Sequence, residues 1–197
     1  HAEPVAPNRL ARQFSVAAPD RAWVTDSTSL PTREGWRYLA VVLDLFARRV
    51  VGWALRPTLE RELVVAALQD AIRRRQPPPG LLHHRDRGRQ YASTDYQAVL
   101  RRAGMTARMR RRGNGWDTAA MESFFATLKA ELPVTVFATH ANARAAVFDY
   151  IERFYNRKRV HSTRAYRTPL RTEQDWQASQ RATGACVHEI GAISLYW

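Results

Sequence analysis

The chain has 197 residues, of which 45% are hydrophobic, so it is long enough for one folded domain with a real core. Its formal net charge is +13, and every basic residue except Lys129, Lys158 and the histidines is an arginine. This charge favours a polyanionic partner, most simply nucleic acid, although a codon bias toward arginine is an alternative source of part of the excess. No apolar run approaches the ~20 residues that span a membrane, and the first residues lack a secretory signal pattern.

The single cysteine, Cys186, excludes an intramolecular disulfide and any multi-cysteine zinc site, and it is compatible with a reducing cytosol. The chain begins at His1 rather than at methionine, so we expect a fragment or a mature piece of a longer protein. Residues 1–20 contain prolines and no clear period, which predicts a linker or the remnant of an upstream segment.

The first part of the chain predicts three strands, over Ala22–Leu30, Arg37–Phe46 and Arg49–Leu55. The second of them is nearly continuous in apolar residues, which indicates a central strand. The short connection at Ala47 and Arg48 fits an antiparallel hairpin between the second and third strands.

The next part alternates helices and strands. The predicted helices cover Leu59–Arg75, Ser93–Gly104, Thr118–Leu132 and Ala141–Tyr155, and the predicted strands cover Leu81–Asp86 and Met105–Met109. On the last helix the apolar spacing predicts a core face made of Ala146, Val147, Tyr150, Ile151 and Phe154. Three antiparallel strands followed by this alternation predict an α/β fold, with a mixed five-stranded sheet and helices on both faces.

Three carboxylates indicate a site for a hard cation. Asp26 lies in an alternating run and shares a strand face with Val24 and Thr28, where an acid is costly unless it is paired or bound to a cation. Asp86 ends a short apolar strand, and Glu122 lies in a predicted helix. An acid at a strand end and another on a helix are how an open α/β sheet presents metal ligands at one edge.

A fourth acid, Asp44, lies in the predicted central strand and is a rival for this site. The alternative interpretation, which we favour, is a strand-end carboxylate that caps or orients the hairpin turn.

Four blocks of the sequence together carry a family resemblance. They are WVTDSTSLPTREGWRYLAVVLDLFARRVVGWAL, LLHHRDRGRQYAS, GNGWDTAAMESFFATLKAEL and YIERFYNRKRVHSTRAYRTPL, and they run from about Trp23 to Leu170. In these blocks the chain resembles the second-reading-frame (OrfB-type) transposases of bacterial insertion sequences, in the retroviral-integrase superfamily. The resemblance implies a ribonuclease-H-like fold with an integrase-like catalytic core over residues 21–170. Residues 171–197 match the family poorly and are assigned as a tail of unknown role.

The resemblance also implies an activity, which is metal-dependent cleavage and strand transfer of DNA through an Asp-Asp-Glu triad. In it, Asp26 bridges two Mg²⁺ or Mn²⁺ ions, while Asp86 and Glu122 each hold one. The implied partners are the DNA ends of a mobile element, its target DNA, and further copies of the chain assembled on DNA. The family's upstream DNA-end-binding region is missing here, and the implied location is the bacterial cytoplasm, near the nucleoid.

Basic residues near these acids are candidate contacts to DNA phosphates, which fix register without reading bases. Lys129 lies seven residues after Glu122, two helical turns along the same face, and the family has a basic residue at the matching place. The other candidates are Arg110, Arg111, Arg112, Arg157, Lys158 and Arg159. The alternative interpretation of each basic residue is a solvent-exposed charge that does not contact DNA. We interpret Asn156 and His161, in the block after the last helix, mostly as structural closure.

The chain departs from the family pattern in a few places. Arg85 and Arg89 stand where the family usually has serine, and Thr118 replaces the usual asparagine. These changes favour a second hypothesis, a catalytically degenerate DNA-binding relic or regulator of the same fold, whereas the three intact acids oppose it. A third hypothesis, a ribonuclease-H-like nuclease that acts on RNA–DNA hybrids, does not account for the WVTD, ESFF and YN-R-H blocks.

Overall fold

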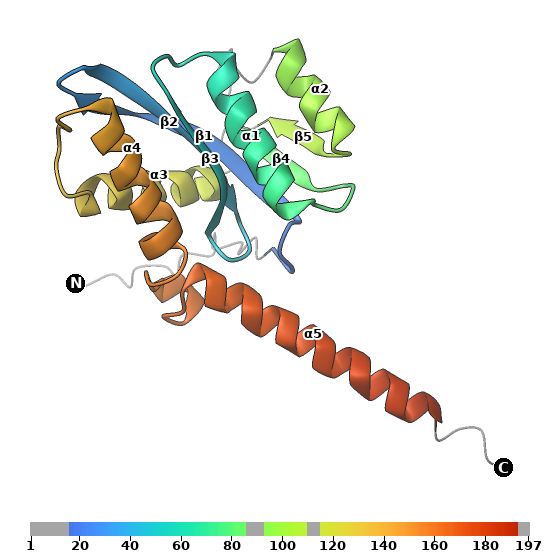
Figure 1. The fold of residues 1–197 in the computed structure, drawn as a ribbon. Coiled ribbons are helices and arrows are strands. Elements are labelled where there is room, and N and C mark those ends of the chain that lie inside the picture. Colours follow the sequence, from blue (N-terminus) through green and yellow to red (C-terminus); the bar gives the residue numbers. More distant parts are fainter. Residues whose placement is uncertain (1–15, 86–92, 110–114, 193–197) are drawn as a thin grey trace, which may run out of the picture.

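A computed structural model describes residues 16–85, 93–109 and 115–192, and its five strands form one mixed sheet (Figure 1). The order across the sheet is β3–β2–β1–β4–β5. The strand β2 is antiparallel to both β1 and β3, whereas β4 runs parallel to β1, and β5 parallel to β4. Their bounds are β1 Ala22–Thr32, β2 Gly35–Asp44, β3 Arg49–Arg56, β4 Leu82–Arg85 and β5 Thr106–Met109. The predicted mixed sheet is confirmed.

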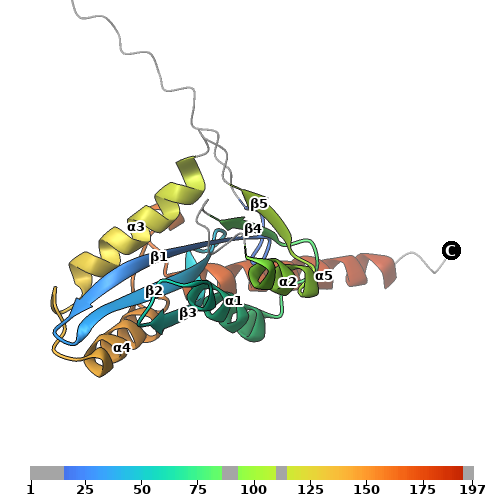
Figure 2. The ribbon, with the colours of Figure 1, turned by 90° about the horizontal axis from the view of Figure 1, so that it is seen from above.

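Helices cover both faces of this sheet (Figure 2). The helices α1 and α2 lie on one face, and α3 and α4 lie on the other. The bounds are α1 Arg61–Arg75, α2 Thr94–Arg102, α3 Gly115–Glu131, α4 His140–Phe148, the π-helix η2 Asp149–Tyr155, the 3₁₀ turn η3 Ser162–Arg164 and α5 Pro169–Ala192. Among the described residues, none of these helices has the length and apolar character required to cross a membrane.

The alternation along β1 decides which face each of its side chains occupies. Val24 and Leu30 belong to the apolar cluster that contains α3, whereas Trp23 belongs to the cluster that contains α1. Successive side chains of a strand point to opposite faces, so Asp26 shares the face of Val24, as the sequence predicts, and this is the face that α3 covers. In β2 the run Leu39–Leu43 is completely buried, which confirms a strand covered on both faces.

The close approach of α1 to β3 depends on Gly52. A Cβ atom at this position would lie 2.4 Å from the backbone nitrogen of Ala71 and 2.6 Å from the carbonyl oxygen of Ala67. These atoms belong to the backbone of α1 and cannot rotate away, so only glycine lets the helix and the strand pack at this distance.

Asp44 organises the turn between β2 and β3. Its Oδ1 atom accepts hydrogen bonds from the backbone N–H groups of Phe46 at 2.8 Å and Ala47 at 3.2 Å, and its Oδ2 accepts from Asp20 at 2.7 Å. Burial raises the pKa of this carboxyl to about 6. The interpretation of Asp44 as an acid that caps the hairpin turn is confirmed.

The helix predicted over Ala141–Tyr155 changes its winding halfway. After α4 it continues as η2, in which the N–H of Asn156 bonds to the carbonyl of Ile151, five residues earlier, at 3.2 Å. This wider turn brings Tyr155 into the core, where its ring packs against Phe124 at a centroid distance of 4.8 Å. The prediction that Phe154 belongs to the core is wrong, because the 3.6-residue period on which it rests does not hold here, and Phe154 is 39% exposed.

Asn156 closes the open edge of the sheet next to β3. Its side-chain Oδ1 accepts a hydrogen bond from the N–H of Val50, and its Nδ2 donates to the carbonyl of Val50, both at 3.0 Å. The amide therefore pairs with the edge strand as another strand residue would, and this agrees with the structural role expected from the sequence.

Replacing Asn156 with alanine should lower the free energy of unfolding by about 2–4 kcal/mol, because both buried backbone groups of Val50 lose their partner. Chemical denaturation measures this loss. The matched control is Asn142→Ala, at an exposed site, which should change stability by no more than about 0.5 kcal/mol. Equal effects of the two substitutions would contradict the edge-closing role.

The helix α5 begins at the body of the protein and projects away from it (Figure 1). Its attachment depends on Glu173, which is only 2% exposed and accepts bonds from Arg49 at 2.5 Å and from Arg75 at 3.0 Å. The described part of the predicted tail, through Ala192, is helical. The division into a core over 21–170 and a tail over 171–197 remains a prediction.

Candidate active site

Asp26 lies in the middle of β1, the central strand of the sheet. Its side chain is half-buried, and its Oδ1 accepts a hydrogen bond from the N–H of Ser27 at 2.8 Å. In the register with β2 it lies opposite Val41, whose side chain belongs to the apolar cluster that α3 completes. A carboxylate is thus held on a rigid strand, at the border between the apolar core and the solvent.

The strand β4 ends one residue before the second acid of the sequence pattern. The parallel ladder between β1 and β4 begins at Ala22 and Leu82 and ends at the pair Thr25 and Arg85. The next residue of each strand in the sequence is an acid, Asp26 after Thr25 and Asp86 after Arg85. Asp86 itself lies outside the described residues.

Glu122 is presented by α3 from the same face of the sheet as Asp26. Its neighbours Met121 and Phe125 are buried against the sheet, whereas Glu122 is exposed. Lys129 is exposed and lies about 20° around the helix from Glu122, since seven residues make nearly two turns. The structure thus places Glu122 and Lys129 along one stripe of α3, at the edge of its buried face.

The donor chemistry of these acids fits a hard divalent cation. Carboxylate oxygens are the ligands that Mg²⁺ and Mn²⁺ take up in proteins. Within residues 16–85, 93–109 and 115–192, no three acidic, histidine or cysteine side chains are grouped closely enough to hold a metal ion. Of the three expected ligands, Asp26 and Glu122 lie within the described residues.

The basic candidates differ in their surroundings. Arg157 and Lys158 are exposed, and the Nε of Arg157 donates to the carbonyl of Glu152 at 3.1 Å. Arg159 is bound instead to Glu131, with its Nε 3.0 Å from both carboxylate oxygens. The remaining candidates, Arg110, Arg111 and Arg112, lie outside the described residues.

His161 lies near three arginines, Arg159, Arg48 and Arg164. Its ring meets the edge of Tyr155 at a centroid distance of 5.1 Å. Burial, followed by the positive charges of Arg159, Arg48 and Arg164, lowers the pKa of His161 from 6.5 to about 4. The ring is therefore neutral in the folded protein at neutral pH.

This histidine makes stability depend on pH. Between pH 6.5 and about 4 the unfolded chain binds a proton at His161 that the folded protein does not, so the free energy of unfolding falls as pH falls. Discounted for the exposed part of the ring, the loss is about 1–2 kcal/mol. Denaturation at several pH values should show that His161→Phe loses this much less stability than the parent. Asp44 acts in the opposite direction but is common to both proteins, so parallel pH profiles would contradict this assignment.

Sequence reasoning did not single out His83, which proves to be completely buried. Its Nε2 lies 2.9 Å from the Thr25 hydroxyl and 3.2 Å from the Tyr96 hydroxyl. The available signal was its place in the alternation of β4, where it shares a face with Leu81 and Arg85 rather than with His84.

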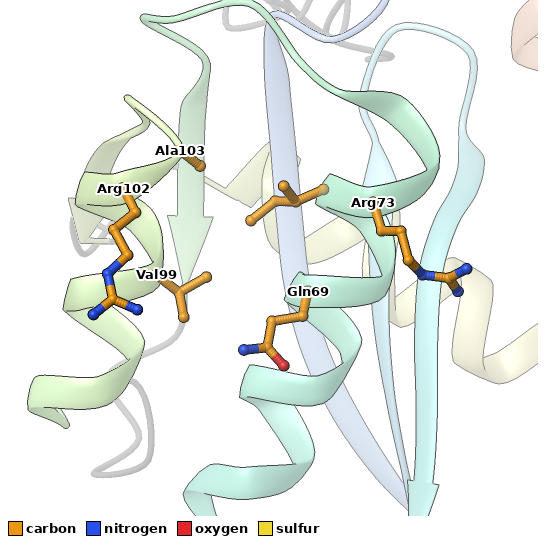
Figure 3. Close-up of a pocket in the computed structure, with 6 residues that line it drawn as sticks. Gln69, Arg73, Val99, Arg102 and Ala103 are labelled. Atoms are coloured by element: carbon orange, nitrogen blue, oxygen red, sulfur yellow. The ribbon is translucent and has the colours of Figure 1, made fainter.

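A pocket between α1 and α2 lies on the opposite face of the sheet from Asp26 (Figure 3). It has a volume of about 290 Å³, and Val99 lies between the two helices while Arg73 points away from them. The lining residues are Gln69, Ile72, Arg73, Val99, Arg102 and Ala103. No acid lines it, so this pocket is separate from the carboxylate site.

The strands β1, β2 and β3 are paired antiparallel, β4 and β5 are added in parallel next to β1, and helices cover both faces of the sheet. This arrangement defines a ribonuclease-H-like α/β fold. The chain belongs to the integrase core domain family, which it matches over residues 16–115 and again over residues 122–174.

Comparison with curated proteins finds relatives among bacterial insertion sequences. The chain is 43% identical over 164 residues to the transposase for insertion sequence element IS904 of Lactococcus lactis, covering 83% of this chain and 65% of that protein. It is 45% identical over 163 residues to transposase InsF for insertion sequence IS3A of Escherichia coli, covering 82% of this chain and 57% of that protein. The chain thus spans less than two thirds of the length of these relatives.

Comparison with solved structures confirms the fold. The HTLV-2 integrase catalytic core domain, solved in complex with magnesium in a trimeric form, superimposes with a TM-score of 0.61 at 15% identity. The match covers 80% of this chain and 98% of that domain. At this identity the likeness establishes the retroviral-integrase fold alone.

Proposed function

We propose that this chain is the catalytic core of a DNA transposase, which cleaves DNA strands and transfers them through the triad Asp26, Asp86 and Glu122. The observation that carries the proposal is that Asp26 and Glu122 lie on the same side of the sheet. Asp26 on the central strand faces α3, which bears Glu122. The β1–β4 ladder ends one residue before both Asp26 and Asp86. The membership of the chain in the integrase core domain family supports the same assignment.

The three carboxylates hold the divalent cations, Mg²⁺ or Mn²⁺, and we propose two ions, by analogy with other phosphodiester-cleaving sites. When bound, these ions supply activation of an oxygen nucleophile and stabilisation of charge on the leaving oxygen. The rigid strand and helix keep the carboxylates in place between turnovers, and this preorganisation lowers the barrier. The magnesium present in the related HTLV-2 structure supports the choice of metal.

Basic side chains position the DNA. Lys129, on the same stripe of α3 as Glu122, contacts a phosphate near the cleaved bond, and Arg157 and Lys158 contact phosphates further away. Arg110, Arg111 and Arg112 follow β5 in the sequence and contribute further phosphate contacts. The charge of Arg159 is already balanced by Glu131, so its contribution is smaller than that of the other basic residues.

The partners follow from the same assignment. The DNA substrates are the ends of a mobile element and its target, and several copies of the chain assemble on them, in the bacterial cytoplasm. The part of the relatives that this chain does not cover supplies the recognition of the element ends.

A second candidate is a catalytically degenerate protein of the same fold that binds DNA without cleaving it. The observation that favours it is Arg85, the last residue of β4, which stands where the family usually has serine and directly precedes the proposed ligand Asp86 in the sequence.

A cleavage and strand-transfer assay separates the two candidates. It uses this chain and its Asp86→Asn variant, magnesium or manganese, and DNA with the element ends found beside the coding sequence. Metal-dependent nicks and joined products from the unmodified chain alone support the transposase. If neither protein acts but both bind DNA in a salt-sensitive way, the assay is repeated with a chain of the full length of the relatives. Continued inactivity then favours the degenerate protein.

A further inference from the structure

A buried polar contact joins β1, β4 and α2 behind the proposed site. His83, Thr25 and Tyr96 are each completely buried. The Nε2 atom of His83 lies 2.9 Å from the Thr25 hydroxyl oxygen and 3.2 Å from the Tyr96 hydroxyl oxygen. Because a hydroxyl both donates and accepts, either tautomer of the ring can hydrogen-bond here, and the two hydroxyls share the single proton or lone pair of Nε2. The rings of His83 and Tyr96 also meet edge-on at a centroid distance of 5.7 Å.

The surroundings of this contact are apolar. Trp23, Leu81 and Leu100 belong to the same buried cluster on this face of the sheet. In such surroundings a hydrogen bond is stronger than in water, and a polar group that loses its partner is costly. Apolar side chains would fill the same space without preferring one relative placement of the three elements, whereas directional bonds select one.

Two of the three residues in the contact lie close to the acids in the sequence. Thr25 immediately precedes Asp26 on β1, and His83 lies three residues before Asp86. Tyr96 lies in the first turn of α2, so it holds the chain that continues after Asp86. The contact therefore ties β4, which ends one residue before Asp86, and the start of α2 to the strand that carries Asp26.

The short ladder explains why such a contact is needed. The strand β4 has only 4 residues, and backbone pairing alone defines register weakly over this length. A slip of one residue would turn the side chains of β4 to the opposite face, away from Asp26.

We propose that His83 is a positioning residue, which acts through Thr25 and Tyr96 to set the spacing of the acid-bearing strands and hence the affinity for the divalent cation. This inference rests on the proposed function. It extends the proposed function to residues on the face of the sheet opposite to Asp26, which act without contacting the cation or the DNA.

The test removes one hydroxyl at a time. His83→Ala would open a cavity and endanger folding, so Thr25→Val and Tyr96→Phe are used, since both nearly preserve shape. The control is Val147→Ala, which removes buried volume from α4 on the other face of the sheet. For each protein the dissociation constant of Mn²⁺ is measured by electron paramagnetic resonance, together with the Mn²⁺ concentration for half-maximal DNA cleavage and the melting temperature.

Thr25→Val should weaken Mn²⁺ binding about 10-fold, as changes behind metal ligands do, and Tyr96→Phe should weaken it in the same direction. The Val147→Ala variant should melt at a lower temperature but bind Mn²⁺ as the parent does. If both hydroxyl variants lose thermal stability yet bind Mn²⁺ like the parent, the contact is only structural and the inference is overturned. If the parent itself binds no Mn²⁺, the proposed function fails and the inference fails with it.

Discussion

Replacing Glu122 with glutamine should lower the rate of metal-dependent DNA cleavage on the order of 10²–10³-fold, a loss typical of removing one preorganised electrostatic group from an active site. The change removes a negative charge and an oxygen ligand while keeping the size of the side chain. Glu122 is exposed, so the free energy of unfolding should change by no more than about 0.5 kcal/mol. Single-turnover cleavage and chemical denaturation measure the two effects separately.

The matched control is Glu62→Gln, in the first turn of α1. Glu62 is also exposed, but it lies on the helix that covers the opposite face of the sheet, and its carboxylate is bound to Arg61. This variant should cleave DNA at the rate of the parent. Cleavage by Glu122→Gln at the parental rate would remove Glu122 from the proposed triad.

Replacing Arg75 with methionine should lower the free energy of unfolding by about 3–5 kcal/mol, the usual cost of breaking a buried ion pair. Its guanidinium lies 2.7 Å from Asp20 and 3.0 Å from Glu173, and it is only 15% exposed. Methionine keeps the apolar stem but removes the cation between two carboxylates. The loss should appear as a lower melting temperature and as a lower denaturant midpoint.

Arg73 is the control, two residues earlier on the same helix. Its guanidinium pairs with Asp70 but is 75% exposed, and Asp70 also binds Arg74. Because exposed pairs contribute little, Arg73→Met should change stability by about 0–1 kcal/mol. If Arg75→Met were as stable as Arg73→Met, the attachment of α5 through Glu173 would not depend on this network.

The sequence predicts the sheet well because the two-residue alternation of its strands matches the burial of their side chains. Along β1 the alternation that separates Trp23 from Val24 also assigns Asp26 to the face of α3, and the apolar clusters confirm that assignment. The acid Asp44 was interpreted correctly as a turn residue, since a carboxylate at a strand end is well placed to accept the N–H groups of the turn.

The failures of prediction have a common physical origin, which is tertiary contact. The π-turn that buries Tyr155 and exposes Phe154 follows the packing of Tyr155 against Phe124, which no local period reveals. The anchor of α5 is equally invisible in the sequence, because Glu173 pairs with residues about a hundred positions away, at Arg75 and Arg49. Likewise, the partners of His83 come from β1 and α2.

In the candidate site, too, the residues were predictable from the sequence, whereas their tertiary contacts were not. Asp26 and Glu122 are found from the sequence by residue type, spacing and family resemblance, and the structure places them on one face. Their contacts were not predictable, including the bond from Ser27 to Asp26 and the pairing of Arg159 with Glu131.

The central claim is that Asp26, Asp86 and Glu122 form one cation site. The most direct measurement is the anomalous scattering of Mn²⁺ in crystals of this chain soaked with the ion. The proposed function predicts anomalous peaks within bonding distance of all three carboxylates. Mn²⁺ bound elsewhere, or carboxylates too far apart to share an ion in the occupied crystal, would contradict it.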